Sequence, residues 1–199
     1  HAVKAVPGRH HVLTGGEDGQ MGVWDGKEGK LVEMIDCQDT MDKNKALTET
    51  DTTQSRDWSW GNDSHLWVSS IDVDDCGNWG AVCGGAEGKS IITNKKTNGF
   101  ISIWNLPTRT LTSAHVTKES LQSVAFHDDF GKIVTLGNES VVSYWSRSRA
   151  AREERAWISA PSGFTISTNE ANGLMAVGGS SDLVDVFAHF GNKAFSLSF

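Results

Sequence analysis

Short runs of alternating apolar and polar residues recur along the chain and are separated by Gly, Asp, Asn and Ser. The segment VLTGGEDGQMGVWD, residues 12–25, shows this pattern most clearly, because two apolar runs flank a Gly-Glu-Asp-Gly turn. Alternation with a period of two predicts half-buried β-strands, and the turn residues predict tight connections between them. No long stretch shows the periodicity of a helical protein. The pattern therefore predicts an all-β fold.

The strand–turn–strand pattern is repeated, and each copy ends in a large aromatic residue. The aromatic positions are Trp24, Trp104, Trp145 and Phe187. Trp104 and Trp145 are 41 residues apart, and Trp145 and Phe187 are 42 apart, which matches the length of a four-stranded propeller blade. Trp24 and Trp104 are 80 residues apart, and we attribute the excess to insertions. The spacing predicts about four four-stranded blades.

The repeats divide the whole chain. We expect a partial β-propeller over 1–199, with blades at 1–35, 66–116, 120–161 and 162–199, an acidic polar insertion at 36–65 and a second insertion at 87–99. The last strand of the third blade is predicted at 156–160, after an arginine-rich loop at 146–156. Four blades make about half of a ring, and the chain begins at His1 in an apparent strand. We therefore expect N-terminal blades to precede it.

Composition narrows the classes of function. The chain has 199 residues and a formal net charge of −7, which argues against a domain-wide grip on nucleic acid because that requires a basic face. No apolar run approaches the roughly 18 residues of a membrane span, so no membrane contact is expected. The cysteines are Cys37, Cys76 and Cys83, without a Cys-x-x-Cys pair. We expect buried thiols rather than disulfides or a zinc site.

No catalytic, cofactor-binding or metal-binding residues are predicted. The adjacent His10 and His11 would point to opposite faces of a strand and cannot ligate one metal ion together. The segment GGAEGKS, residues 84–90, contains Gly-Lys-Ser but lacks the glycine spacing of a phosphate-binding loop. The expectation is a protein without enzymatic activity, cofactor or small-molecule substrate.

The segment GGEDGQMGVWD resembles the end of a WD repeat. In that family a turn Asp hydrogen-bonds neighbouring groups and a Trp packs between adjacent blades. Asp18 and Trp24 match these positions, Thr14 matches the strand hydroxyl, and His65 and His115 lie where the family often has a histidine that bonds the turn Asp. The resemblance implies a WD-repeat β-propeller whose structural positions are Thr14, Asp18, Trp24, Trp104, Trp145, Asp182 and Phe187.

The order of these motifs is also similar to that of the THO complex subunit 6 family. The similarity runs from GGEDG and VWD through WGAVCGG and YW, and its most specific part is the C-terminal VDVFAHFGNKAFSLSF. It implies the C-terminal four blades of a seven-bladed ring. It also implies a non-enzymatic scaffold subunit of the nuclear THO/TREX assembly, supporting mRNA processing and export. Other THO/TREX subunits are the implied partners, with RNA contacted indirectly.

Candidate contact residues lie in the less regular segments. They are Trp58 and Trp60 in the acidic insertion, Lys95 and Lys96 in the second insertion, and Arg147, Arg149 and Arg152 in the arginine-rich loop. Exposed tryptophans serve as anchors for protein partners, and basic side chains contact RNA phosphates.

Two alternative functions remain open. One is a substrate receptor of a ubiquitin ligase, a class of WD protein that usually carries Trp-Asp-x-Arg at the end of the third strand. Here Lys27 stands in place of that Arg, and a lysine does not reproduce the forked pairing of arginine with a carboxylate. The other is a propeller that binds RNA directly through its arginine-rich loop, with an affinity that falls steeply with salt.

Overall fold

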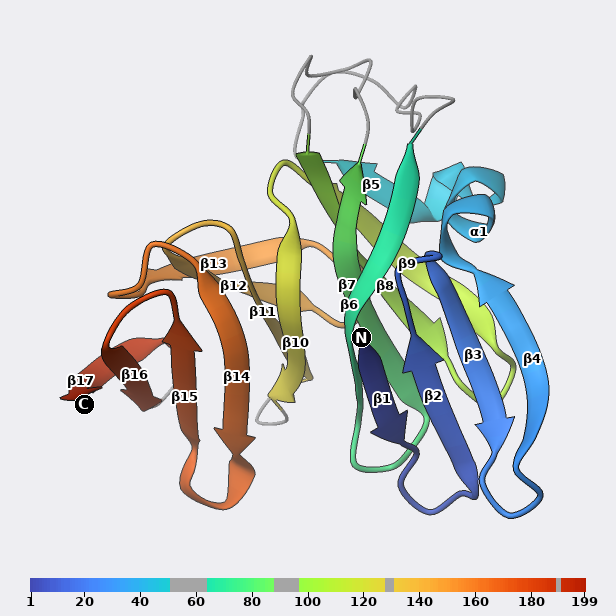
Figure 1. Cartoon of the computed structure of the whole chain (residues 1–199), viewed down its shortest axis with the longest axis horizontal. Helices are drawn as coiled ribbons and strands as arrows, with labels where there is room; N and C mark the ends of the chain where they lie inside the picture. The colour runs from blue at the N-terminus through green and yellow to red at the C-terminus, as the bar shows by residue number, and fades with distance from the viewer. Residues whose placement is uncertain (51–63, 88–96, 128–130, 189–190) are drawn as a thin grey trace.

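The alternating segments form four consecutive β-sheets. The computed structural model describes residues 1–50, 64–87, 97–127, 131–188 and 191–199. In Figure 1 the sheets follow one another in chain order, from the first sheet on the right to the fourth on the left. The prediction of an all-β protein is confirmed.

Each sheet contains four antiparallel strands in sequence order. The first sheet contains β1 (Ala2–Ala5), β2 (His11–Gly15), β3 (Gln20–Asp25) and β4 (Lys30–Asp36). The second contains β6 (His65–Val73), β7 (Trp79–Glu87), β8 (Thr97–Asn105) and β9 (Thr110–Thr117), and the short β5 (Thr48–Thr50) joins it in parallel beside β9. The third contains β10 (Leu121–His127), β11 (Lys132–Gly137), β12 (Val141–Ser146) and β13 (Arg152–Trp157). The fourth contains β14 (Gly163–Asn169), β15 (Leu174–Gly179), β16 (Leu183–Ala188) and β17 (Asn192–Ser198), with a 3₁₀ turn, η2 (Glu170–Asn172), between its first two strands.

The first strands of the four sheets lie beside one another. Strand β1 packs against β6, β6 against β10, and β10 against β14, whereas the outer edges are formed by β4, β13 and β17, and by β5 beside β9 in the second sheet. Asp72 on β6 links three of these inner strands, because its carboxylate accepts the Phe126 amide of β10 at 2.7 Å and pairs with Lys4 of β1 at 2.5 Å. This radial arrangement of four-stranded sheets is that of a WD-type propeller.

Three apolar layers hold the sheets together, and each contains the aromatic residue of the sheet that follows. Trp104 of the second sheet packs with the apolar residues of the first, Trp145 of the third packs with those of the second, and Phe187 of the fourth packs with those of the third. All three side chains are at most 2% exposed. Burial of aromatic rings of this size stabilises each interface by a few kcal/mol, about 2–3 per ring.

One face of the first sheet and one face of the fourth sheet have no sheet packed on them within the described residues. On the first sheet, Val3 is 71% exposed and Met34 44% exposed, and on the fourth, Phe195 is 54% and Leu197 49% exposed. Trp24 lies on the open face of the first sheet, in cross-strand register with Val12, and is only half-buried. Its counterparts in later sheets are fully buried because each has a preceding sheet to pack against.

The segment after the first sheet contains regular structure that strand alternation did not indicate. Helix α1 (Cys37–Lys43) begins where the Asp36 side chain accepts the Asp39 amide at 2.8 Å, and a 3₁₀ turn, η1 (Lys45–Leu47), follows. Cys37 and Met41 of α1 are fully buried in the first apolar layer. Helix α1 has seven residues, and no helix in the described part of the chain is long and apolar enough to cross a membrane.

The last strand of the third sheet starts earlier than predicted. Strand β13 covers residues 152–157 instead of 156–160, so Arg152 belongs to a strand and not to a loop. The reason is its position at the outer edge, where most of its side chains are exposed and no apolar alternation is needed. Similarly, β7 continues to Glu87 and β8 starts at Thr97, and residues 88–96 lie outside the described residues.

Candidate functional site

Two tryptophan–threonine pairs repeat the same geometry in different sheets. The Trp24 indole Nε1 donates to the Thr14 hydroxyl at 2.8 Å, and the Trp145 indole Nε1 donates to the Thr135 hydroxyl at 2.8 Å. Each bond crosses from the third strand of a sheet to the second strand. Gly22 leaves room for the first pair, since a Cβ at this position would approach both the Thr14 hydroxyl and the Trp24 indole nitrogen within 2.7 Å.

The aromatic positions of the second and fourth sheets differ in their hydrogen bonds. Trp104 donates from its indole to the Ser102 hydroxyl at 2.9 Å, a residue of its own strand. Phe187 has no donor and contributes only to the third apolar layer. These four aromatic residues therefore occupy equivalent framework positions and are not gathered in one site.

The turn between β2 and β3 is organised by Asp18. Its carboxylate accepts the Gln20 amide at 3.2 Å. Gly19 follows with φ +70°, and a Cβ there would lie 2.8 Å from the Leu66 carbonyl of the second sheet, so a side chain is excluded on both counts. In the corresponding turn of the fourth sheet, Asp182 is exposed, and its backbone carbonyl accepts the Phe199 amide at 3.3 Å.

Asp185, which the sequence analysis did not single out, is the buried acid of the fourth sheet. It is 2% exposed and accepts from the Ser159 amide at 2.5 Å, from the Ser196 hydroxyl at 2.7 Å and from the Lys193 ammonium at 2.7 Å. Burial alone would raise the pKa of Asp185, but the bonds from Lys193, Ser196 and Ser159 outweigh it and lower the pKa to about 2. The available signal was an acidic residue within the apolar run LVDVF.

The arginines of β13 bind a buried glutamate. Glu119, which precedes β10, is 8% exposed, and its Oε1 contacts Arg152 Nη2 at 2.6 Å and Arg155 Nη2 at 2.9 Å. The Arg152 guanidinium also lies over the Trp145 ring, 4.6 Å from its centroid. Arg152 is therefore engaged within the fold.

The other candidate contact residues are placed differently. Arg147 lies over the Trp79 ring at 5.8 Å and 4.0 Å from the Asp74 carboxylate, whereas Arg149 is exposed. The remaining candidates fall outside the described residues; they are Trp58, Trp60, Lys95 and Lys96.

The histidines and cysteines considered as candidates do not lie together in one site. His115 is buried with its ring edge-on to Trp145, 5.1 Å between centroids, whereas His65 is exposed at the start of β6. Burial raises the pKa of Cys83 and of Cys37 to about 12. Within the described ranges, no three His, Cys, Asp or Glu side chains are placed to bind a metal ion.

Cys76 corrects the expectation that all three thiols are buried. It is exposed in the turn between β6 and β7, and its thiol donates to the Asp74 carboxylate at 3.4 Å. The reason is local, since a turn residue lies outside the layers between the sheets.

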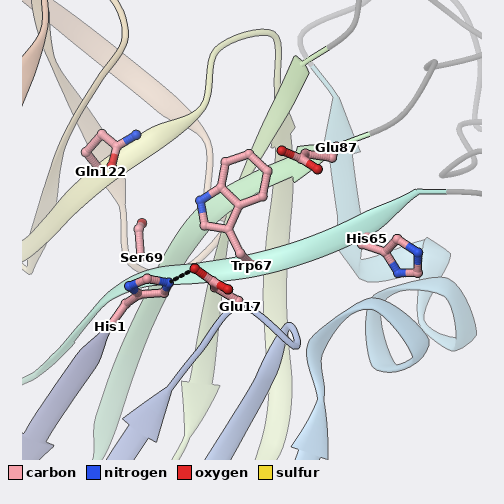
Figure 2. Close-up of a pocket in the computed structure, with 7 residues that line it drawn as sticks. All are labelled: His1, Glu17, His65, Trp67, Ser69, Glu87 and Gln122. Atoms are coloured by element: carbon pink, nitrogen blue, oxygen red, sulfur yellow. Dashed lines mark hydrogen bonds and ion pairs between the residues drawn. The ribbon is translucent and has the colours of Figure 1, made fainter.

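A cavity of about 650 Å³ opens beside the inner strands β1, β6 and β10 (Figure 2). Its lining combines one aromatic ring with polar and acidic groups and consists of His1, Glu17, His65, Trp67, Ser69, Glu87 and Gln122. These residues come from the start of the chain, the β2–β3 turn, β6, β7 and β10. No local motif joins them, so the sequence offered no signal for this cavity.

The absence of a side chain at Gly85 leaves room for the Trp67 ring in the cavity. A Cβ at Gly85 would lie 2.1 Å from the Trp67 ring, so the ring packs directly on the backbone of β7. In Figure 2 the indole lies between Gln122 and Glu87, while Glu17 lies below it beside His1. The His1 ring contacts Glu17 at 3.0 Å. The Ser69 hydroxyl, which also lines the cavity, donates to the Leu121 carbonyl at 2.7 Å and so links β6 to β10.

Comparison with known proteins adds a family resemblance. No family model matches the chain. It is 30% identical over 192 residues to THO complex subunit 6 of Arabidopsis thaliana, an alignment that covers 96% of this chain and 42% of that protein. It is 25% identical over 193 residues to THO complex subunit 6 of Homo sapiens and to its homolog of Mus musculus, covering 94% of this chain and 47% of each. The chain thus spans less than half the length of these relatives.

A solved structure supports the fold. The crystal structure of Chaetomium thermophilum Raptor aligns with 99% of this chain and 16% of its own length, with a TM-score of 0.68 and 16% identity. At 16% identity, the match supports only the fold. Together with the sheet arrangement and the matched relatives, it shows that the chain has the fold of a WD-type propeller segment and is similar to THO complex subunit 6 over nearly the whole length of this chain.

Proposed function

We propose that this chain is part of a non-enzymatic scaffold subunit of the THO/TREX complex in the nucleus, and that it supports mRNA processing and export through contacts with other THO subunits. The observation that carries the proposal is the similarity to THO complex subunit 6 of a plant and of mammals along almost the entire chain. A similarity that includes all four sheets favours a shared framework over one shared motif.

The roles of the buried charged groups support a scaffold. Asp185 binds Ser159, which precedes β14, and Lys193 and Ser196 of β17, and Glu119 binds two arginines of β13. Acids held by several hydrogen bonds and ion pairs stabilise the fold and are poor candidates for proton transfer. The framework instead presents loops and sheet edges to partners.

We further propose that additional sheets cover the two open faces of this segment to complete a seven-bladed ring. The half-buried Trp24 and the exposed Val3 and Met34 mark one open face, and Phe195 and Leu197 mark the other. Contiguous apolar faces of this kind are normally covered in soluble proteins. The alignments cover less than half of each matched relative, so more than half of each relative lies outside the region that matches this chain and is available for further blades.

Affinity purification of the tagged full-length protein from nuclear extract, followed by mass spectrometry, tests the scaffold role. The expected result is recovery of other THO subunits at levels well above a tag-only control. A propeller of unrelated function with the same tag serves as the matched control. Recovery of unrelated partners alone, or of ubiquitin-ligase adaptors instead of THO subunits, would contradict the proposal.

A further inference from the structure

We propose that the cavity around Trp67 binds a basic side chain, arginine or lysine, from an extended segment of a protein partner. The proposal rests on the proposed scaffold function, because it assigns a recognition site to the contacts of such a subunit. The cavity lies beside the inner strands of three consecutive sheets. Its volume of about 650 Å³ accommodates one or two side chains of a bound peptide.

The Trp67 ring forms an aromatic wall of the cavity that can contact a cationic group. Trp67 packs on the backbone of Gly85, which restricts the ring without covering it completely, and the indole is half-buried. A tryptophan face is the most favourable aromatic partner for an ammonium or guanidinium group. Because the ring is already ordered, little side-chain entropy is lost when a ligand stacks on it.

The charge at the cavity favours the same ligand. Glu17 and Glu87 line it together with Trp67, and both carboxylates are exposed. Glu17 already contacts the His1 ring at 3.0 Å, whereas no ion pair to Glu87 is found among the described residues. Glu87 is therefore the group best placed to receive a guanidinium or ammonium beside the indole.

A nucleic acid fits the site poorly. Two carboxylates repel a phosphate backbone, and the formal net charge of the chain is −7. A neutral apolar side chain would desolvate the Glu87 carboxylate and the Gln122 amide without offering either group a hydrogen bond. The combination of one aromatic face and flanking acids selects a cationic side chain from a protein.

The test measures binding of a fluorescein-labelled Gly/Ser nonapeptide with one central arginine to the full chain by fluorescence anisotropy. A second peptide carries citrulline, which has nearly the same shape but no charge. The arginine peptide is expected to bind about tenfold more tightly. Trp67→Ala should weaken the arginine peptide about tenfold and Glu87→Gln about fivefold, and both losses should shrink for the citrulline peptide.

Glu28→Gln is the matched control, because Glu28 is an exposed glutamate in the β3–β4 turn and does not line the cavity. The Glu28→Gln variant should bind the arginine peptide with the same affinity as the unchanged protein. Trp67→Phe and thermal unfolding of each variant separate loss of the indole from loss of the fold. Equal binding of the two peptides, no detectable binding of either, or unchanged affinity in Glu87→Gln would overturn the inference.

The outcome is separable from that of the proposed function. Peptide binding with the expected pattern but no THO subunits on purification would refute only the THO assignment. Normal recovery of THO subunits together with failure of the peptide test would refute only the cavity assignment.

Discussion

The indole of Trp145 and the hydroxyl of Thr135 form a hydrogen bond of 2.8 Å between neighbouring strands of the third sheet. Both side chains are at most 1% exposed. The same bond joins Trp24 to Thr14 in the first sheet, but there the indole is only half-buried. The two pairs have the same chemistry and differ in burial, so they allow the energetic effect of the covering sheet to be measured.

Replacement of Trp145 by phenylalanine should destabilise the protein by about 2–3 kcal/mol. The change removes the donor and leaves the buried Thr135 hydroxyl without its partner. Urea unfolding of Trp145→Phe measures the loss. The double variant Trp145→Phe/Thr135→Val should recover part of it, because no buried hydroxyl then lacks a partner.

Trp24→Phe is the matched control for this prediction. Water can reach the half-buried Thr14, so the loss in a segment with an open first face should be about 1 kcal/mol or less. Equal losses at Trp24 and Trp145 would contradict the role of burial.

Glu119→Gln should destabilise the protein by about 3 kcal/mol, since it removes the buried carboxylate that contacts the guanidinium groups of Arg152 and Arg155. Urea unfolding at pH 7 measures the change. Glu139→Gln is the control, because Glu139 pairs with Arg155 at 3.1 Å but is 44% exposed. A loss of less than about 0.5 kcal/mol is expected there. If both variants lose the same stability, the Glu119 cluster is not a framework element.

The two acids of the fourth sheet show where sequence reasoning succeeded and where it stopped. The turn chemistry and the 41- and 42-residue spacings predicted the sheets, because tight turns and buried aromatics are encoded locally. The choice between Asp182 and Asp185 depends on Ser159, Lys193 and Ser196, which only the folded chain brings together. Local pattern cannot reveal such a convergence.

The cavity and two of the elements were missed for related reasons. Trp67 and Glu87 come from different strands of the second sheet, and Gln122, across the cavity from them, comes from the third sheet in chain order. Strand β13 has no apolar alternation because it is an outer edge strand. Helix α1 has only seven residues, too few to show a helical period, and its start is marked mainly by the cap at Asp36.

Asp185→Asn should lower stability at pH 7 by about 2 kcal/mol and weaken its dependence on pH in acid. The pKa of Asp185 is lowered from 3.8 to about 2. A lowered folded-state pKa stabilises the protein above the unfolded value, and this contribution is lost as the pH falls from about 4 towards 2. Urea unfolding across this range should show a smaller slope in the variant. Asp182→Asn, at the exposed neighbouring acid, should keep the original slope, and identical slopes in all three proteins would contradict the assignment.

The thiols should differ in reactivity with iodoacetamide according to their place in the sheets. Cys76 is exposed, whereas Cys37 lies in the first apolar layer and Cys83 in the second, where burial raises the pKa of each thiol to about 12. The thiolate is the reactive form, so peptide mass spectrometry should find label on Cys76 alone in the folded protein and on all three in denaturant. The Cys76→Ser variant should therefore carry no label in the folded state.

In that variant, slow labelling of Cys83 that becomes faster when Trp145→Phe is added would report opening of the layer between the second and third sheets, because Cys83 and Trp145 both belong to that layer. Rapid labelling of Cys83 in the unchanged protein would show that this layer is not closed.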